Sequence, residues 1–358
     1  MSEYSSSAAS LRKKLHGCPE PSMAESRTKS ALIDYLSREC DLEIIDRGCW
    51  FYAAYRYDES SESIAIRADF DAVTGEDGVS RHLCGHDGHA AILASFAKWI
   101  SDNKPKKNVF LVFQPGEESG EGAKICCELF SLERIDKIFG LHNIPGKPLG
   151  TLLLKKGTFA CASEGLEIKL AGKPAHAAYP EFGINPAEAI SKIVLGITQE
   201  LNIPHRGIVL STVIGIEAGS DHYGVSASDG LLRLTVRAEF ADEFSAIVGF
   251  IRSLTAAVAH EYGLKYSISE KDVFPSTENH DSCVALLEKA AGKAGLNTEE
   301  LNLPMRWSED FGHFLGKVQG AFFGIGAGEN CAELHTAGYE FPDEVISFAH
   351  RIFAELCK

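Results

Sequence analysis

The spacing of apolar and polar positions predicts a chain in which strands and helices alternate. The predicted helices cover residues 8–40, 88–101 and about 120–132. The predicted strands cover residues 42–57 and 62–69 and begin again near residues 109 and 138. This βαβ alternation predicts an α/β fold with a mixed, largely parallel sheet and helices on both faces.

The pattern changes after Ala162 and predicts a second, smaller α+β domain. Its predicted strands are Leu166–Leu170, Ile208–Ile216, Leu231–Phe240 and Leu264–Ser269, and its predicted helices are Pro186–Leu201 and Asp242–Tyr262. A chain of 358 residues is also too long for one ordinary core. We therefore predict a discontinuous first domain of residues 1–163 and 273–358, into which residues 164–272 are inserted.

Potential ligands and acids stand where three predicted strands end. Val109–Phe113 runs directly into Glu117 and Glu118, and the next strand finishes on His142. A third apolar strand, near residue 321, leads through glycine-rich sequence to His335. Each histidine alone is more often a core or surface residue than a ligand. Because ligands of open α/β sheets collect at the carboxyl ends of strands, we nevertheless predict one shared site.

The run His82–His89 adds further donors in a turn just ahead of a predicted helix. Cys84 and His86 are two residues apart, and Gly85 and Gly88 let the backbone turn so that several side chains converge. Thiolate and imidazole groups are usual ligands of zinc-type ions, so this run predicts a metal site. The alternative is the capped start of a helix that contains a buried cysteine.

Two aspartates end the strand-like run Ile64–Asp71. Asp69 and Asp71 are separated by one residue, so in extended geometry they share a face of the strand. They would add carboxylates to the same edge of the sheet. The alternative is an ordinary strand end with turn-forming aspartates.

Several short motifs resemble those of a known family. They are Leu15–Glu20, Arg67–Ala72, His82–His89, Phe113–Glu118, Gly140–His142, Gly172–Pro180 and Ser308–Phe311. In this order they resemble the amidohydrolase branch of the aminoacylase/carboxypeptidase dinuclear metallopeptidases. That branch includes hippurate hydrolases, plant auxin-conjugate hydrolases and N-acetyl-diaminopimelate deacetylases. The resemblance covers nearly the whole chain and is specific for the branch, but it says little about the substrate.

The resemblance implies a zinc-peptidase-like catalytic domain that binds two divalent ions, of zinc, manganese, cobalt or nickel. The implied ligands are Cys84 as the bridge, Glu118 and His335 on one ion, and His86 and His142 on the other. Glu117 would be the general base for a metal-activated water. Asp71 would orient a ligand imidazole. Asp69 stands where the wider family has a metal-binding histidine, and we count it among the candidate substrate contacts. For His89 we predict structural hydrogen bonds in preference to metal binding.

For the inserted domain, the resemblance implies a lid that is used for dimerisation. His176 would reach the neighbouring subunit's site and stabilise a tetrahedral oxyanion, although a loop histidine that caps a helix is the alternative. Arg237 would bind a substrate carboxylate, or else be a solvated strand residue. Residues Tyr223–Ser228 differ from the usual family sequence and lack its substrate-contacting asparagine, so the substrate contacts of the lid are left open.

Composition narrows the partners and the compartment. The net charge of -15 argues against nucleic acid or an anionic membrane surface as a partner. The N-terminal sequence lacks the apolar core of a secretory signal, and no apolar run is long enough to span a bilayer, so we expect the cytoplasm. The ten cysteines include no Cys-x-x-Cys pair. In a reducing compartment they stay thiols, as Cys84 must be in order to bind metal.

These observations together predict a metal-dependent amidohydrolase that removes an N-acyl group from an N-acyl amino acid or a similar small amide, working as a homodimer. One alternative is a dipeptidase or carboxypeptidase on the same scaffold. Another is a catalytically inactive relative that binds a small ligand. The presence of Glu117 together with all five candidate ligands argues against an inactive protein.

Overall fold

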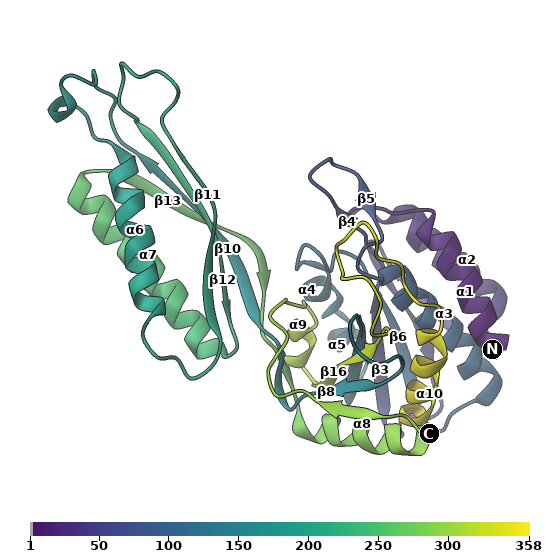
Figure 1. The fold of residues 1–358 in the computed structure, drawn as a ribbon. Helices are drawn as coiled ribbons and strands as arrows, with labels where there is room; N and C mark the ends of the chain where they lie inside the picture. Colours follow the sequence, from purple (N-terminus) through teal and green to yellow (C-terminus); the bar gives the residue numbers. More distant parts are fainter. Residues whose placement is uncertain (1–2) are drawn as a thin grey trace. The chain divides into compact units, whose positions relative to one another are not determined.

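The computed structural model describes residues 3–358, which form two compact units (Figure 1). The first unit comprises the chain up to Phe159 together with Thr277–Pro304 and Glu309–Lys358. The second comprises Ala160–Ser276 and the short segment Met305–Ser308.

The first unit is built on an eight-stranded sheet with the order β1-β2-β6-β3-β7-β16-β8-β15. Its strands are β1 (Glu43–Arg47), β2 (Trp50–Tyr55), β3 (Ser63–Asp69), β6 (Asn108–Gln114), β7 (Lys137–Ile144), β8 (Leu152–Leu154), β15 (Thr298–Glu300) and β16 (Gln319–Gly326). The four central strands β6, β3, β7 and β16 run parallel, whereas β1 and β2 form an antiparallel hairpin at the edge. Because the four central strands run parallel, their carboxyl ends meet at one edge of the sheet.

Two small ladders pair β4 (Val73–Thr74) with β5 (Ser80–Arg81) and β9 (Gly157–Ala160) with β14 (Thr277–Asn279).

Helices cover both faces of this sheet (Figure 1). The longer helices on one face are α1 (Glu3–His16), α2 (Ser26–Glu39), α3 (His86–Asn103), α8 (Asp281–Ala294) and α10 (Val345–Cys357). The short helices on the other are α4 (Gly122–Cys126), α5 (Leu129–Leu132) and α9 (Gly312–Leu315). The predicted α/β fold with a mixed, largely parallel sheet is confirmed.

Alternation along the central strands explains why both faces need cover. In β6, Leu111 and Phe113 pack in the core beneath the longer helices, while Phe110 and Val112 point to the opposite face and are also buried. Phe51 stacks on Phe113 at 4.5 Å between ring centroids. A strand that is apolar on both sides is stable only inside a three-layer structure, so its polar residues are confined to its ends.

The second unit is a four-stranded antiparallel sheet with two helices against one face (Figure 1). Its elements are β10 (Ala162–Ala171), a 3-10 turn (Pro180–Phe182), α6 (Pro186–Leu201), β11 (Val209–Ala218), β12 (Asp229–Ala238), α7 (Ala241–Tyr262) and β13 (Lys265–Phe274), with the strand order β11-β12-β10-β13. Leu166, Ile168 and Leu170 alternate along β10 and pack with both helices in one core. The strands and helices predicted for this segment are all present.

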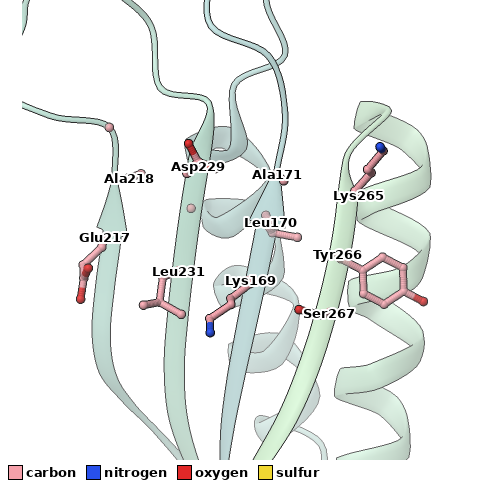
Figure 2. A pocket seen from close by; sticks show the side chains of 12 residues that line it. Lys169, Leu170, Ala171, Glu217, Ala218, Asp229, Leu231, Lys265, Tyr266 and Ser267 are labelled. Carbon is pink, nitrogen blue, oxygen red and sulfur yellow. The ribbon is translucent and has the colours of Figure 1, made fainter.

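A hollow of about 540 Å³ lies at one end of this second sheet (Figure 2). Lys169, Leu231 and Glu217 stand side by side there on neighbouring strands. Lys265 and Asp229 complete its charged lining, so two ammonium groups balance two carboxylates. None of the residues predicted for the site lines this hollow.

One long predicted helix is wrong in its middle. Residues 8–40, predicted to be helical throughout, form α1 and α2 with residues 17–25 between them. Pro19 and Pro21 lie in that gap. Proline lacks a backbone N–H and its ring clashes with the preceding helical turn, so the helix must stop there.

Two other predicted elements are divided in the structure. The predicted strand over residues 42–57 is the hairpin of β1 and β2, and the helical stretch at 120–132 is two short helices, α4 and α5.

Within residues 3–358, no helix combines the length and the apolar character needed to cross a membrane.

Candidate metal centre

The predicted site residues of the first unit gather at the carboxyl edge of its parallel strands. β6 leads into the turn of Glu117 and Glu118, and β7 carries His142. Cys84 and His86 stand at the beginning of α3. Gly85 between them has a φ of 102°, and a Cβ there would lie 2.4 Å from Asn143 Oδ1, so only glycine fits this close turn.

Five donors form two groups that share Cys84. One group is Cys84, His86 and His142, and the other is Cys84, Glu118 and His335; within each, the donor atoms lie within 4.8 Å of one another. Cys84 Sγ is 3.4 Å from His142 Nε2 and 3.3 Å from His335 Nε2. His335 Nε2 is 3.4 Å from Glu118 Oε1. Side chains from four separate parts of the sequence thus converge around one thiol.

The chemistry of this donor set fits divalent cations. His86 Nε2 and Glu118 Oε1 are buried and have no hydrogen-bond partner among the described residues, which is costly unless another group satisfies them. Burial raises the pKa of the Cys84 thiol, so a cation is the group that would stabilise its thiolate. Mixed sulfur, nitrogen and oxygen donors suit zinc-type ions.

Asp71 holds the His86 ring in place. His86 Nδ1 donates to Asp71 Oδ1 at 2.9 Å, which leaves Nε2 as the atom that faces Glu118 Oε1 at 3.8 Å. The second oxygen of Asp71 accepts from Ser22 Oγ at 2.7 Å and from the Glu118 backbone N–H at 3.0 Å. Asp71 therefore holds two of the proposed ligands, His86 through its imidazole ring and Glu118 through its backbone N–H.

His89 and Asp69 form a buried layer beneath the donors. His89 Nδ1 donates to Asp69 Oδ1 at 2.7 Å, and Nε2 lies 2.7 Å from Asn143 Oδ1. Both ring nitrogens are engaged, which is the structural role that we predicted for His89. The other oxygen of Asp69 accepts from Arg67 at 2.6 Å, and the side chain is fully buried. This position does not support the substrate contact that we expected of Asp69.

Arg67 is the centre of this buried layer. Its guanidinium donates to Asp69, to Gln114 at 2.7 Å, to Glu309 at 2.9 Å and to Asp310 at 2.8 Å. All three carboxylates are buried, so breaking this network from one side would leave uncompensated charges. The network joins the ends of β3 and β6 to residues 309–310 beneath the proposed ligands.

Glu117 lies beside the two groups that share Cys84 and belongs to neither of them, although its carboxylate also lies within 4.8 Å of donor atoms of His86 and Glu118. Its Oε2 is 4.0 Å from His86 Nε2, and its Oε1 accepts from the Asp310 backbone N–H at 3.4 Å. Burial raises the pKa of Glu117 well above its ordinary value, and the carboxylates of Glu309 and Asp310 raise it further. Glu117 is thus a carboxylate next to the donors that neither group requires.

The predicted site residues of the second unit are His176 and Arg237. His176 is exposed, and its Nδ1 accepts from the Ala178 N–H at 3.1 Å, so in the neutral ring the proton is on Nε2. Arg237 donates to the Arg306 carbonyl at 3.1 Å and to Ser308 Oγ at 2.8 Å. The guanidinium therefore holds the 305–308 segment, a role that we did not predict.

The altered segment Tyr223–Ser228 supports the loop of His176. The Ala175 N–H donates to Ser226 Oγ at 2.9 Å, and the Ala177 N–H donates to the Gly224 carbonyl at 2.9 Å. His176 itself pairs with Val225 in an isolated bridge. The segment that departs from the usual family sequence is thus a structural support for this histidine.

Several supporting residues had no assigned role in the sequence analysis. Glu309 and Asp310 lie inside the motif Ser308–Phe311, and their adjacency to each other was a signal that we did not use. Ser22 is a single polar residue in a loop and Asn143 is one near the end of β7, and nothing in their local pattern distinguishes them from ordinary loop and strand-end residues.

The chain matches the model of peptidase family M20/M25/M40 over residues 65–358. It is 28% identical over 363 residues to the N-acetylcysteine deacetylase of Bacillus subtilis, covering 97% of this chain and 94% of the relative. It is 28% identical to the N-acetyldiaminopimelate deacetylase of Leuconostoc mesenteroides, covering 91% and 90%. Among solved structures, a Bacillus subtilis protein described as a dinuclear metal binding peptidase of the M20 family has a TM-score of 0.83 and 25% identity, covering 99% and 97%.

These matches confirm the resemblance that the motifs indicated. Because the family model spans most of the sequence, the chain belongs to peptidase family M20/M25/M40.

Proposed function

We propose that this chain is a metal-dependent amidohydrolase that removes an N-acyl group from an N-acyl amino acid or a similar small amide. The observation that carries this proposal is the pair of donor groups that share Cys84, with the carboxylate of Glu117 beside them and outside both groups. The names of the two deacetylases support it, because both describe hydrolysis of an N-acetylated amino acid.

The proposed metal ligands follow the two donor groups. Glu118 and His335 would hold one divalent cation, His86 and His142 the other, and the thiolate of Cys84 would lie between them. Bound cations would polarise the amide carbonyl and lower the pKa of a water molecule. The donor types fit zinc, manganese, cobalt or nickel as the native ion. The similar Bacillus subtilis protein is described as a dinuclear metal binding peptidase, which supports two ions.

Glu117 is the general base of the proposed reaction. Its carboxylate accepts a proton from the attacking water as a C–O bond forms at the carbonyl carbon. That proton then passes to the amide nitrogen as the C–N bond breaks, which releases an amine and a carboxylic acid. The Asp310 N–H holds one oxygen of Glu117, and the other lies toward His86 Nε2.

We also propose a homodimer that forms through the second unit. Its edge strand β11 exposes Val213, Ile214 and Ile216, and Ile214 is 62% exposed. An edge strand with apolar residues and unpaired backbone groups is a template for pairing with another chain. In such a dimer, the Nε2–H of His176 would donate to the oxyanion in the neighbouring subunit's site.

The proposed setting is the cytoplasm, with a small molecule as substrate. All ten cysteines of the chain are free, and Cys84 must be a thiol before it can bind metal. The net charge of -15 also favours a small substrate held in a local site over nucleic acid or an anionic membrane.

A metal analysis and a substrate screen test the function. The purified protein should contain two divalent ions per chain and should release a ninhydrin-reactive amine from N-acetyl amino acids. Chelation should abolish this release, and a divalent metal should restore it. Release from dipeptides alone would contradict the proposed substrate class. A metal-loaded protein that is inactive on every N-acyl amino acid and dipeptide would contradict amidohydrolase function.

Alkylation should test the role of Cys84. If its thiolate binds the cations, iodoacetamide should spare Cys84 in the metal-loaded protein and label it after chelation, because a coordinated thiolate is shielded. Half-buried Cys18, Cys40 and Cys331 lie outside the donor groups and are internal controls, with labelling that should change little on chelation. The readout is peptide mass spectrometry. Full labelling of Cys84 in active, metal-loaded protein would exclude the proposed ligand set.

A further inference from the structure

The loop between α1 and α2 is hydrogen-bonded at three points to the segments that carry the metal centre. The Ala72 backbone N–H donates to the Glu20 carbonyl at 2.9 Å, and Ser22 Oγ donates to Asp71 Oδ2 at 2.7 Å. The third attachment is the Gly116 N–H, which donates to Glu25 Oε1 at 2.8 Å. This loop is far in sequence from every proposed ligand, yet it contacts both the strand end after β3 and the turn after β6.

Glu25 directs its carboxylate away from its own helix. It precedes the first residue of α2, but it makes no side-chain capping bond to that helix within the described chain. Glu20 caps α2 instead, because its carboxylate accepts from the Thr28 N–H at 2.8 Å and the Arg27 N–H at 3.2 Å. The carboxylate of Glu25 accepts from Met23 N and Gly116 N, both at 2.8 Å and both on Oε1.

The position of Glu25 matters because of what Gly116 carries. Gly116 has a φ of 60° and is the turn residue that immediately precedes Glu117. A Cβ on Gly116 would lie 2.5 Å from Met23 Sδ, so residues 23–25 pack closely against this turn. Glu25 is only 4% exposed, and a buried carboxylate is retained only when hydrogen bonds compensate its burial.

Glu117 and Glu118 are held by different attachments. The Glu118 backbone is bonded to Asp71, whose other oxygen orients His86. The side of the turn nearer to Glu117 is bonded to Glu25 through Gly116. Loss of the Glu25 attachment should therefore displace Glu117 more than it displaces the proposed ligand Glu118.

We propose that Glu25 is a positioning residue for Glu117, acting through the Gly116 N–H to hold the carboxylate where it receives the proton of the attacking water. The proposal rests on the proposed function and deepens it. A general base contributes fully only when it is held in hydrogen-bonding reach of that proton, and displacement by about 1 Å can cost on the order of a hundredfold in rate. Because both bonds are accepted by a single oxygen, an amide oxygen in the same place would serve equally well.

The test compares three variants of the metal-loaded protein. Glu25→Ala should lower kcat about tenfold while KM and the metal content stay near wild type, because the affected proton transfer belongs to the transition state. Glu25→Gln should keep kcat within about twofold, since its side-chain oxygen can accept both bonds. The matched control is Glu20→Ala, which removes another buried carboxylate of the same loop and should lower stability without changing the kcat of the folded enzyme. If Glu25→Ala does not fold, Glu25→Asp repeats the test, because its shorter side chain does not reach Gly116.

A double variant separates positioning of the base from general loosening. Added to Glu117→Gln, Glu25→Ala should cause little further loss, because no base is left to position. A full tenfold further loss, an equal kcat loss in Glu20→Ala, or a wild-type kcat in Glu25→Ala would each overturn the proposal. A fall in metal content that matches the fall in kcat would also overturn it. Failure of the proposed function is recognised separately, by a wild-type enzyme without amidase activity or by a fully active Glu117→Gln.

Discussion

Glu117→Gln should keep two metal ions per chain and lose at least about a hundredfold of kcat, whereas Glu118→Gln should lose metal. The two residues are adjacent in sequence, but their surroundings differ. Glu118 Oε1 lies 3.4 Å from His335 Nε2 inside a group that includes Cys84. Glu117 lies 4.0 Å from His86 Nε2 and accepts from Asp310 N–H. An amide at position 117 can still accept that bond but cannot take a proton from water.

The measurement is metal content by elemental analysis beside steady-state kinetics on the substrate found in the screen. Glu133→Gln is a matched control, because it changes a carboxylate of the same unit that bonds to Tyr52 and Arg56, away from the metal centre. It should leave both metal content and kcat unchanged. Equal loss of metal in the Glu117 and Glu118 variants would contradict the assignment of Glu118 as a ligand and Glu117 as the general base.

The sequence was informative wherever a residue's role depends on its local element. His142 and the Glu117–Glu118 pair could be placed because an apolar strand leads directly to each of them, and parallel strands end at one edge. The run that contains Cys84 and His86 was informative because Gly85 lies directly before an apolar helix. The change of pattern after Ala162 likewise predicted the strands and helices of the second unit.

Roles that depend on contacts between distant segments could not be predicted from the sequence. Asp69 ends its strand as predicted, but only the fold shows that its oxygens are taken by Arg67 and His89. Arg237 has the pattern of an ordinary strand residue, and its partner segment is about seventy residues away in the chain. Glu25 looks like a first-turn acid of α2, and the bond to Gly116 that distinguishes it joins residues 91 positions apart.

His176→Ala should lower kcat with metal content intact, by about 3 kcal/mol if it resembles the removal of one oxyanion donor. The motivation is its position in the second unit, on an exposed loop that Ala178, Gly224 and Val225 hold in place. Its Nε2 is the protonated nitrogen of the neutral ring, so it can donate to an oxyanion. A control is His222→Ala, which removes another exposed histidine of the same unit and should leave kcat unchanged.

Mixing two defective chains should show whether His176 serves its own subunit or its neighbour. In a dimer of one His176→Ala chain with one Glu117→Gln chain, the site with intact Glu117 receives an intact His176 from the partner. Random exchange of equal amounts gives half heterodimers with one working site in two, so activity should return to about a quarter of wild type per total chain. Subunit exchange is confirmed by native mass spectrometry. If heterodimers form and activity does not return, His176 does not act across the interface, and its bond to Ala178 would then be a purely structural one that fixes its own loop.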